Sequence, residues 1–209
     1  MQGDDALHSA VRLLPIVFTL VFATVGGGVT LAKVGYYSPF YIIGTALALI
    51  GSALFHVAKL DTNAGRIYGY SVLIGIGCGL FVQNGFSVAQ AKVPAAQLGA
   101  ATGFIALGQL IGPTIALSVA GTVFINEATS GLEALLPDVP VAEVKNAITG
   151  TAGNLLNTLD PATREAALAV IVNAMDKVYI LAITAMAVAF VAACCLRHEK
   201  IVIQPAAAS

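Results

Sequence analysis

Hydrophobic and charged positions are segregated along this chain. Five apolar stretches contain no Asp, Glu, Lys or Arg, and they cover Leu13–Ala32, Phe40–Ala58, Tyr68–Gln90, Gly99–Ile125 and Val178–Leu196. A helix needs about 20 apolar residues to cross the hydrocarbon core of a bilayer. A charge at the bilayer centre costs about 2.5–3.5 kcal/mol on insertion scales. The pattern therefore predicts an all-α, polytopic membrane helix bundle with five transmembrane helices.

The polar residues between these stretches divide the chain into five parts. In order, we expect an exoplasmic loop remnant (1–11), four transmembrane helices (12–125), a long exoplasmic loop (126–175), a fifth transmembrane helix (176–197) and a cytoplasmic tail (198–209). The long loop holds most of the acidic residues. Asp160 followed by Pro161 is typical of a helix start. We therefore expect a helix near 161–175 that leads, with a bend near Asn173, into the last span.

Composition supports a membrane protein and disfavours several other classes. The chain is 58% hydrophobic and 10% charged, whereas soluble domains carry about 25% charged residues. A water-soluble core of this size would need a larger charged coat than these residues supply. The formal net charge is −1, which gives no indication of nucleic acid as a partner. The expected partner is the lipid bilayer.

Catalytic chemistry has little support in the sequence. No carboxylate lies inside any apolar stretch, so this chain offers no intramembrane proton relay of its own. The three cysteines, Cys78, Cys194 and Cys195, show no metal-ligand or disulfide spacing. We therefore predict no enzymatic activity, no catalytic residue, no cofactor and no metal site.

Three amides are the main polar candidates within the apolar stretches: Gln83, Asn84 and Gln109. An unpaired polar group in apolar surroundings is costly, so each amide needs a partner. One interpretation places them along a substrate pathway. The other is structural, with hydrogen bonds between helices worth about 0.6–2 kcal/mol each. Both remain open from the sequence.

Small residues mark expected helix-packing positions. Gly75, Gly77 and Gly79 recur at every second position of the third stretch, and Gly112 and Pro113 lie in the middle of the fourth. Small residues allow helices to approach closely in lipid. A proline in the middle of a span can kink the helix, because neighbouring helices or waters satisfy the freed carbonyl.

One segment resembles a known transporter motif. The pattern Gly28-x-x-Leu31-x-Lys33-x-Gly35-Tyr36-Tyr37 is similar to the Gly/basic signature of a tight cytoplasmic turn in the second half of major facilitator superfamily proteins. Further features occur in the matching order: a glycine-rich third span ending in Gln83, Gly108-Gln109-x-x-Gly112, and a long acidic loop before the last span. Together they resemble the C-terminal part of fungal fourteen-span drug:proton antiporters of the toxin and multidrug efflux type.

The resemblance implies a location and a role for several residues. It assigns Gly28, Lys33 and Gly35 to a cytoplasmic gate motif, places the long loop outside, and places the C-terminus in the cytoplasm. Lys33 would either pair with an acid or a helix C-terminus across the gate, or be a snorkelling interfacial lysine. The first half of such a transporter is missing here, so we expect a C-terminal fragment or a truncated gene product.

The implied function is proton-coupled efflux of drugs, toxins or secondary metabolites, most readily at the plasma membrane and alternatively at the vacuolar membrane. Superfamily transporters bind substrate between two halves. A small-molecule substrate would therefore require the missing N-terminal half. Two alternatives stay open: a truncated membrane fragment that does not transport, and part of a vacuolar basic amino acid transporter.

Overall fold

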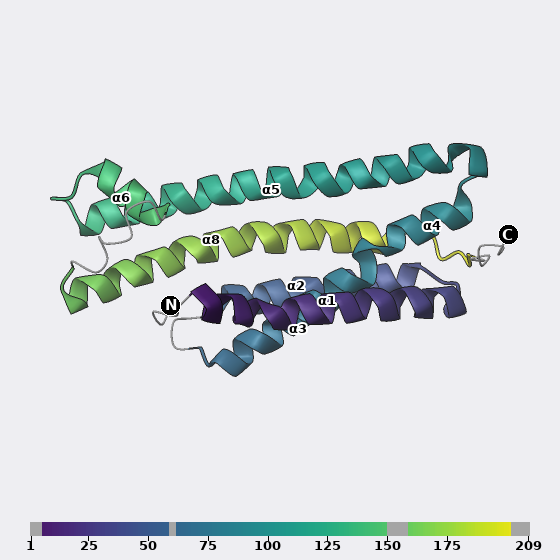
Figure 1. The fold of residues 1–209 in the computed structure, drawn as a ribbon, viewed down its shortest axis with the longest axis horizontal. Coiled ribbons are helices and arrows are strands. Elements are labelled where there is room, and N and C mark those ends of the chain that lie inside the picture. The colour runs from purple at the N-terminus through teal and green to yellow at the C-terminus, as the bar shows by residue number, and fades with distance from the viewer. Residues whose placement is uncertain (1–5, 59–61, 150–158, 202–209) are drawn as a thin grey trace.

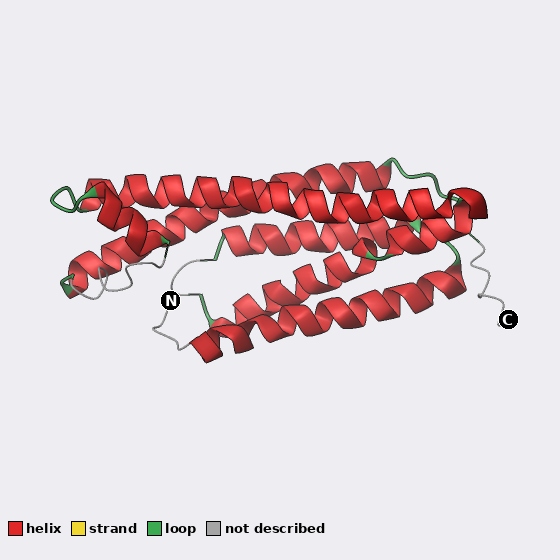
Figure 2. Cartoon of the chain, turned by 45° about the horizontal axis from the view of Figure 1, so that its top comes forward, coloured by secondary structure: helices red, strands yellow, loops and turns green. Residues whose placement is uncertain are grey.

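The computed structural model of the chain describes residues 6–58, 62–149 and 159–201. Within these ranges the regular structure is helical, and the only extended pairing is an isolated antiparallel bridge between Tyr36 and Lys200 (Figure 2). This confirms the all-α prediction. Residues 1–5 of the expected loop remnant and 202–209 of the expected tail lie outside the described residues.

The described helices follow one another in a simple order along the chain. Their bounds are α1 (Ala6–Val34), α2 (Ser38–His56), α3 (Ala64–Val82), α4 (Asn84–Lys92), the 3-10 turn η1 (Ala95–Gln97), α5 (Leu98–Leu135), α6 (Val141–Ile148) and α8 (Pro161–Cys194). Five helical stretches in the described part of the chain are long and apolar enough to cross a membrane, with α3 and α4 counted together. The predicted number of spans is confirmed.

The long helices lie side by side as an elongated bundle (Figure 1). Helices α1, α2 and α3 pack together, α8 packs against α2, and α5 packs against α8. The far ends of α5 and α8 extend beyond the three-helix group, and α6 covers them there. At the opposite end, the α1–α2 turn, the end of α4 and the residues after α8 come together.

Glycines bring α3 unusually close to both of its neighbours. A Cβ atom on Gly77 would lie 2.6 Å from the carbonyl oxygen of Gly44 in α2, and one on Gly79 would lie 2.6 Å from the carbonyl oxygen of Leu20 in α1. Gly75 approaches α1 in the same way. Residues four apart share a helix face, whereas residues two apart do not. The glycine spacing therefore allows α3 to fit between α1 and α2.

Helix α5 is longer than a bilayer requires. Its 38 residues at 1.5 Å per residue span about 57 Å, against a hydrocarbon core of about 30 Å. The helix does not end at residue 125, where the sequence places the start of the long loop, but continues to Leu135. The extension is explained by packing, because Leu132 is buried in a cluster with Val144 of α6 and Ile171 of α8.

Helix α8 is continuous where the sequence analysis expects a bend. It runs unbroken through Asn173 from Pro161 to Cys194. No glycine or internal proline interrupts this region, and the flanking Ile171 and Ala174 are both buried. The described part of the expected loop is therefore mostly helical. Its location outside the membrane stays a prediction.

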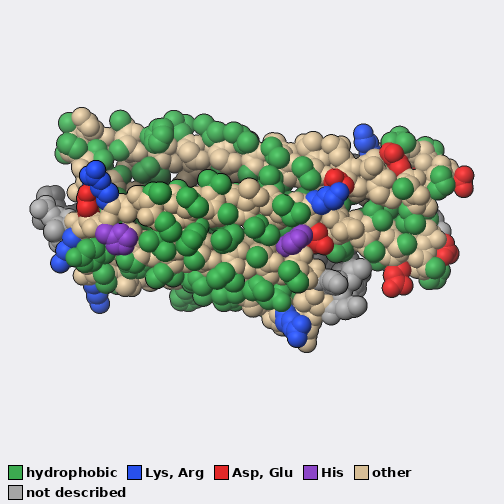
Figure 3. Space-filling view, turned by 180° about the vertical axis from the view of Figure 1, so that it is seen from behind, with side chains coloured by type: hydrophobic (Ala, Val, Ile, Leu, Met, Phe, Trp, Pro, Cys, Tyr) green, Lys and Arg blue, Asp and Glu red, His purple; other side chains and the backbone are tan. Residues whose placement is uncertain are grey.

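Apolar and charged side chains are segregated on the surface, as they are along the sequence. Hydrophobic side chains cover the middle of the face seen in Figure 3, while the charged side chains lie toward the ends. On α5, every residue from 103 to 119 except 105 and 106 is exposed, and Phe104 and Leu117 are 78% and 76% exposed. A water-soluble monomer rarely exposes an apolar patch of this extent. The bundle is built for an apolar environment.

Candidate functional site

The third apolar span is interrupted at Gln83. Helix α3 ends at Val82 and α4 begins at Asn84. The N–H of Phe86 would bond to the carbonyl of Val82 in a continuous helix, but it bonds to the carbonyl of Gln83 at 3.2 Å. The following Asn84-Gly85 pair favours such a break, because asparagine competes for local hydrogen bonds and glycine gains little from being helical.

Two of the three candidate amides bond to carbonyls at this break. Gln109 of α5 donates from Nε2 to the carbonyl of Val82 at 3.0 Å. The buried Asn84 donates from Nδ2 to the carbonyl of Leu80. The Gln83 side chain is exposed. The structure thus brings the three amides to one place, where two of them donate to backbone carbonyls and Gln83 is exposed.

The surroundings of Gln109 on α5 are open. A Cβ atom on Gly108 or Gly112 would meet nothing within 4 Å, so neither glycine packs against another described helix. Pro113 lies inside α5 without ending it. Because proline has no N–H, the carbonyl of Gln109 one turn earlier loses its helical donor. The face next to the break is therefore polar at the backbone and uncovered by the described residues.

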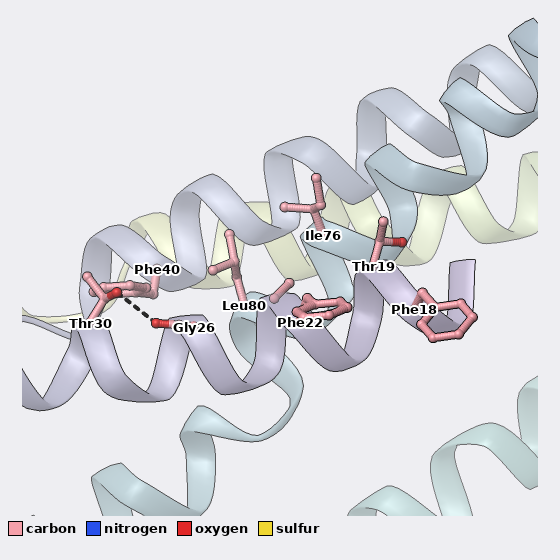
Figure 4. A pocket seen from close by; sticks show the side chains of 10 residues that line it. Phe18, Thr19, Phe22, Gly26, Thr30, Phe40, Ile76 and Leu80 are labelled. Atoms are coloured by element: carbon pink, nitrogen blue, oxygen red, sulfur yellow. Dashed lines mark hydrogen bonds between the residues drawn. The ribbon is translucent and has the colours of Figure 1, made fainter. Parts of the chain in front are cut away.

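An apolar groove of about 430 Å³ lies along α1 and α3 (Figure 4). Its two hydroxyl groups bond within their own helix: Thr19 to the carbonyl of Pro15 at 2.6 Å, and Thr30 to the carbonyl of Gly26 at 2.7 Å. The groove is lined by Phe18, Thr19, Phe22, Ala23, Gly26, Gly27, Thr30, Phe40, Ile76 and Leu80. With its hydroxyls satisfied, it suits an apolar surface and not a polar ligand.

The expected gate motif forms the turn between α1 and α2. Gly35 has a φ of +75°, and its N–H bonds to the carbonyl of Leu31 at 2.8 Å. This is a left-handed helix C-cap, which favours glycine. A Cβ atom on Gly28 would meet nothing within 4 Å. Lys33 is exposed, and in the described part of the chain it has no ion-pair partner.

A different lysine occupies the polar centre at this end of the bundle. Lys92, the last residue of α4, donates to the Tyr37 hydroxyl at 3.3 Å and lies 4.9 Å from the centre of the Tyr37 ring. It also forms an ion pair with Glu199. This pair was not predicted from the sequence. A signal for it was present, since Glu199 is the one acidic residue of the expected tail, 198–209.

Acidic and metal-ligating side chains are dispersed elsewhere. No group of three or more His, Cys, Asp or Glu side chains that could share a metal ion occurs among the described residues. The opposite end of the bundle holds a second ion pair, Lys177 to Glu127 at 2.5 Å.

No family model matches the sequence, and no solved structure matches it. Curated relatives do match. The chain is 42% identical over 200 residues to the MFS-type transporter pgmG of Aspergillus terreus, which covers 96% of this chain and 36% of that protein. It is 43% identical over 208 residues to the efflux pump alnA of Emericella nidulans, covering 100% of this chain and 38% of that one.

A third relative is the phomenoic acid biosynthesis cluster MFS-type transporter of Leptosphaeria maculans. It is 37% identical over 226 residues, covering 100% of this chain and 36% of the relative. The chain belongs to the major facilitator superfamily. The resemblance drawn from the turn motif is thereby confirmed, and the chain spans little more than a third of the length of these relatives. With its five apolar helices, this member of the superfamily is an integral membrane protein.

Proposed function

We propose that this chain is the C-terminal part of an efflux transporter that exports a fungal secondary metabolite or toxin in exchange for protons. The observation that carries the proposal is similarity along the whole chain to proteins named as efflux pumps and transporters, one of them from a biosynthesis cluster. Similarity that was confined to a short motif would not extend over five spans.

The geometry is consistent with a substrate pathway at the break between α3 and α4. Secondary transporters commonly bind substrate where a membrane helix is interrupted. Here the accessible Gln83 and the Gln109 side chain from α5 lie at such an interruption. The apolar stretches contain no carboxylate, so proton coupling would use acidic residues from the rest of the transporter.

The first test is a C-terminal tag at the genomic locus, followed by blotting of membranes and an assay of efflux of a fluorescent drug with and without a protonophore. Protonophore-sensitive efflux that is lost on deletion of the gene supports the proposal. A product of the size of this chain alone, with efflux equal to that of the deletion strain, would support the truncated, non-transporting alternative.

Variants at the break test the substrate pathway. We expect Gln109→Ala and Gln83→Ala to lower efflux by raising the KM for the exported compound. Thr114→Ala is the matched control, since Thr114 is an exposed residue of α5 whose hydroxyl donates to the carbonyl of Leu110 in its own helix, at 2.7 Å. Equal efflux in all three variants at equal expression would show that the amides are structural.

Location separates the remaining alternative. We propose that the transporter resides in the plasma membrane with a cytoplasmic C-terminus, and microscopy of the tagged protein combined with protease protection of the tag tests both points. A tag at the vacuolar membrane, together with reduced vacuolar lysine and arginine on deletion, would favour the vacuolar basic amino acid transporter.

A further inference from the structure

The residues that follow α8 fold back onto the α1–α2 turn. We call residues 197–201 the strap. The N–H of Ile201 donates to the carbonyl of Gly35 at 2.7 Å, and Lys200 pairs with Tyr36 in an antiparallel bridge. A Cβ atom at position 35 would lie 2.9 Å from the carbonyl oxygen of Ile201. Gly35 therefore serves two purposes, because it caps α1 and leaves room for the strap backbone.

Apolar burial anchors the end of the strap. Ile201 is 5% exposed and packs with Leu31, which is fully buried, and Tyr37, which is 6% exposed. Val88 and Ala91 of α4 pack against the same cluster. An isoleucine that follows a polar Arg-His-Glu-Lys run is thus a core residue, in a cluster that includes residues of α1, the α1–α2 turn and α4.

Charged and polar contacts flank this anchor. Glu199 forms an ion pair with Lys92 at the end of α4, and Arg197 lies 3.9 Å from the same carboxylate. The His198 ring lies 3.4 Å from the Ser38 hydroxyl at the start of α2. The strap is therefore held by backbone pairing, apolar burial and an ion pair, each at a different part of the surface formed by the α1–α2 turn and α4.

The strap connects elements that are otherwise weakly joined. Helix α4 has nine residues and is separated from α3 by the break at Gln83. Its last residue, Lys92, contacts the α1–α2 turn through Tyr37 and the strap through Glu199. We propose that the strap is a docked internal ligand of the α1–α2 turn, and that it holds α4 against that turn until it detaches.

The first experiment measures docking in membranes that contain the whole chain. The cysteine pair Tyr36→Cys and Lys200→Cys is introduced into a background with Cys78, Cys194 and Cys195 changed to Ser, and the initial rate of oxidative cross-linking is measured. We expect rapid cross-linking at neutral pH. Adding Glu199→Lys should lower the rate about two- to fivefold, which is the scale of an exposed ion pair.

Charge reversal distinguishes the ion pair from a general loss of structure. The double change Lys92→Glu with Glu199→Lys should restore the cross-linking rate, whereas each single change lowers it. Arg197→Gln is the matched control, because the Arg197 side chain is 88% exposed and lies 3.9 Å from the Glu199 carboxylate, at the outer limit of an ion pair. Ile201→Asp should lower the rate about tenfold or more, since a charge would have to enter the apolar cluster.

The second experiment asks whether the strap holds α4. Ala89 is a buried residue of α4, and in the cysteine-free background Ala89→Cys reports exposure of that helix through its rate of alkylation. We expect Glu199→Lys and Ile201→Asp to speed alkylation, and the charge-swapped pair to return it to the starting rate. Cross-linking that is unaffected by these changes would overturn docking, and constant alkylation would overturn the hold on α4. Neither readout depends on transport.

Discussion

The two sides of the bundle are packed by different means. Helices α1, α2 and α3 are in close contact through glycines, so that a Cβ atom at Gly77 would collide with backbone atoms of α2. Helix α5 also carries glycines in its first half, but a Cβ atom on Gly103, Gly108 or Gly112 would meet nothing within 4 Å. Glycine content alone therefore does not report packing. What matters is whether a partner helix lies opposite the glycine.

The difference also separates two parts of α5. Its middle is exposed, whereas its last turns are buried against α6 and α8. In lipid there is no hydrophobic drive between helices, so association depends on close packing and hydrogen bonds. Among the residues that the structure describes, the exposed middle of α5 has one hydrogen bond to the neighbouring span, from Gln109 to the carbonyl of Val82. This face can therefore be covered by lipid or by another part of a longer transporter.

The largest expected effect is at the buried end of α5. Leu132→Ala should reduce the free energy of unfolding by about 2–5 kcal/mol, because it leaves a cavity in the cluster with α6 and α8. Leu117→Ala in the exposed middle of the same helix should change it much less. Denaturant titration of the detergent-solubilised chain measures both. Similar losses would mean that the middle of α5 is packed as well.

The next effect tests the glycines themselves. Gly77→Ala should destabilise the protein by about 1–3 kcal/mol, because the new methyl group meets backbone atoms that cannot move away without shifting α2. Gly112→Ala should be neutral or stabilising by up to about 1 kcal/mol, since alanine is the better helix former and space is open. If Gly77→Ala lowers the free energy of unfolding and Gly112→Ala does not, only the first glycine is packed against a partner helix. Equal destabilisation by both changes would refute this difference.

A smaller effect is expected at the start of α8. The pKa of the Asp160 carboxyl group is lowered first by a hydrogen bond from the Thr163 side chain and then by one from the N–H of Thr163, which lies 3.2 Å from the carboxylate. A lowered pKa contributes stability above the ordinary pKa of an aspartate, about 3.9, and loses it as pH falls through the folded value. Asp160→Ala should lower the unfolding temperature at pH 7, and Asp160→Asn should retain the cap without its pH dependence.

The smallest effect concerns the strap. The hydrogen bond from Lys92 and its positive charge lower the pKa of Glu199, with a weaker contribution from Arg197. The contribution of this pair is therefore complete at neutral pH and is lost only below the ordinary range of a glutamate, about pH 4.3. The Tyr36→Cys/Lys200→Cys cross-linking rate should fall there more steeply than the rate of the same pair carrying Glu199→Gln, a comparison that cancels the titration of the thiols themselves.

A decline centred near neutral pH would contradict this assignment to Glu199. Glu199→Gln should remove the acidic decline.

Much of the fold was predictable because lipid acts on each helix separately. The five apolar stretches and the helix start at Asp160 depend on residues close together in sequence. The break at Gln83 was not predicted, because an apolar stretch reads as continuous until the partners of its carbonyls are known. The carbonyls of Leu80 and Val82 accept hydrogen bonds from side-chain amides, and one of these amides lies on another helix.

The candidate site shows the same division. The sequence identified Gln83, Asn84 and Gln109, but not that they meet at one interruption. It singled out Lys33 for the turn, whereas the structure places Lys92 at the polar centre, beside Tyr37. The choice between two lysines at the same end of the bundle depends on distances that neither local pattern nor charge counting contains.

By itself, the sequence determined that this protein is a five-span membrane helix bundle of the major facilitator type, because the transfer of each segment into lipid depends on its own residues. Only the tertiary structure decided which glycines pack, where the third span breaks, and that the strap docks on the α1–α2 turn. These depend on contacts between distant residues, such as Lys92 and Glu199, 107 positions apart. Their energies exist only after the helices have come together.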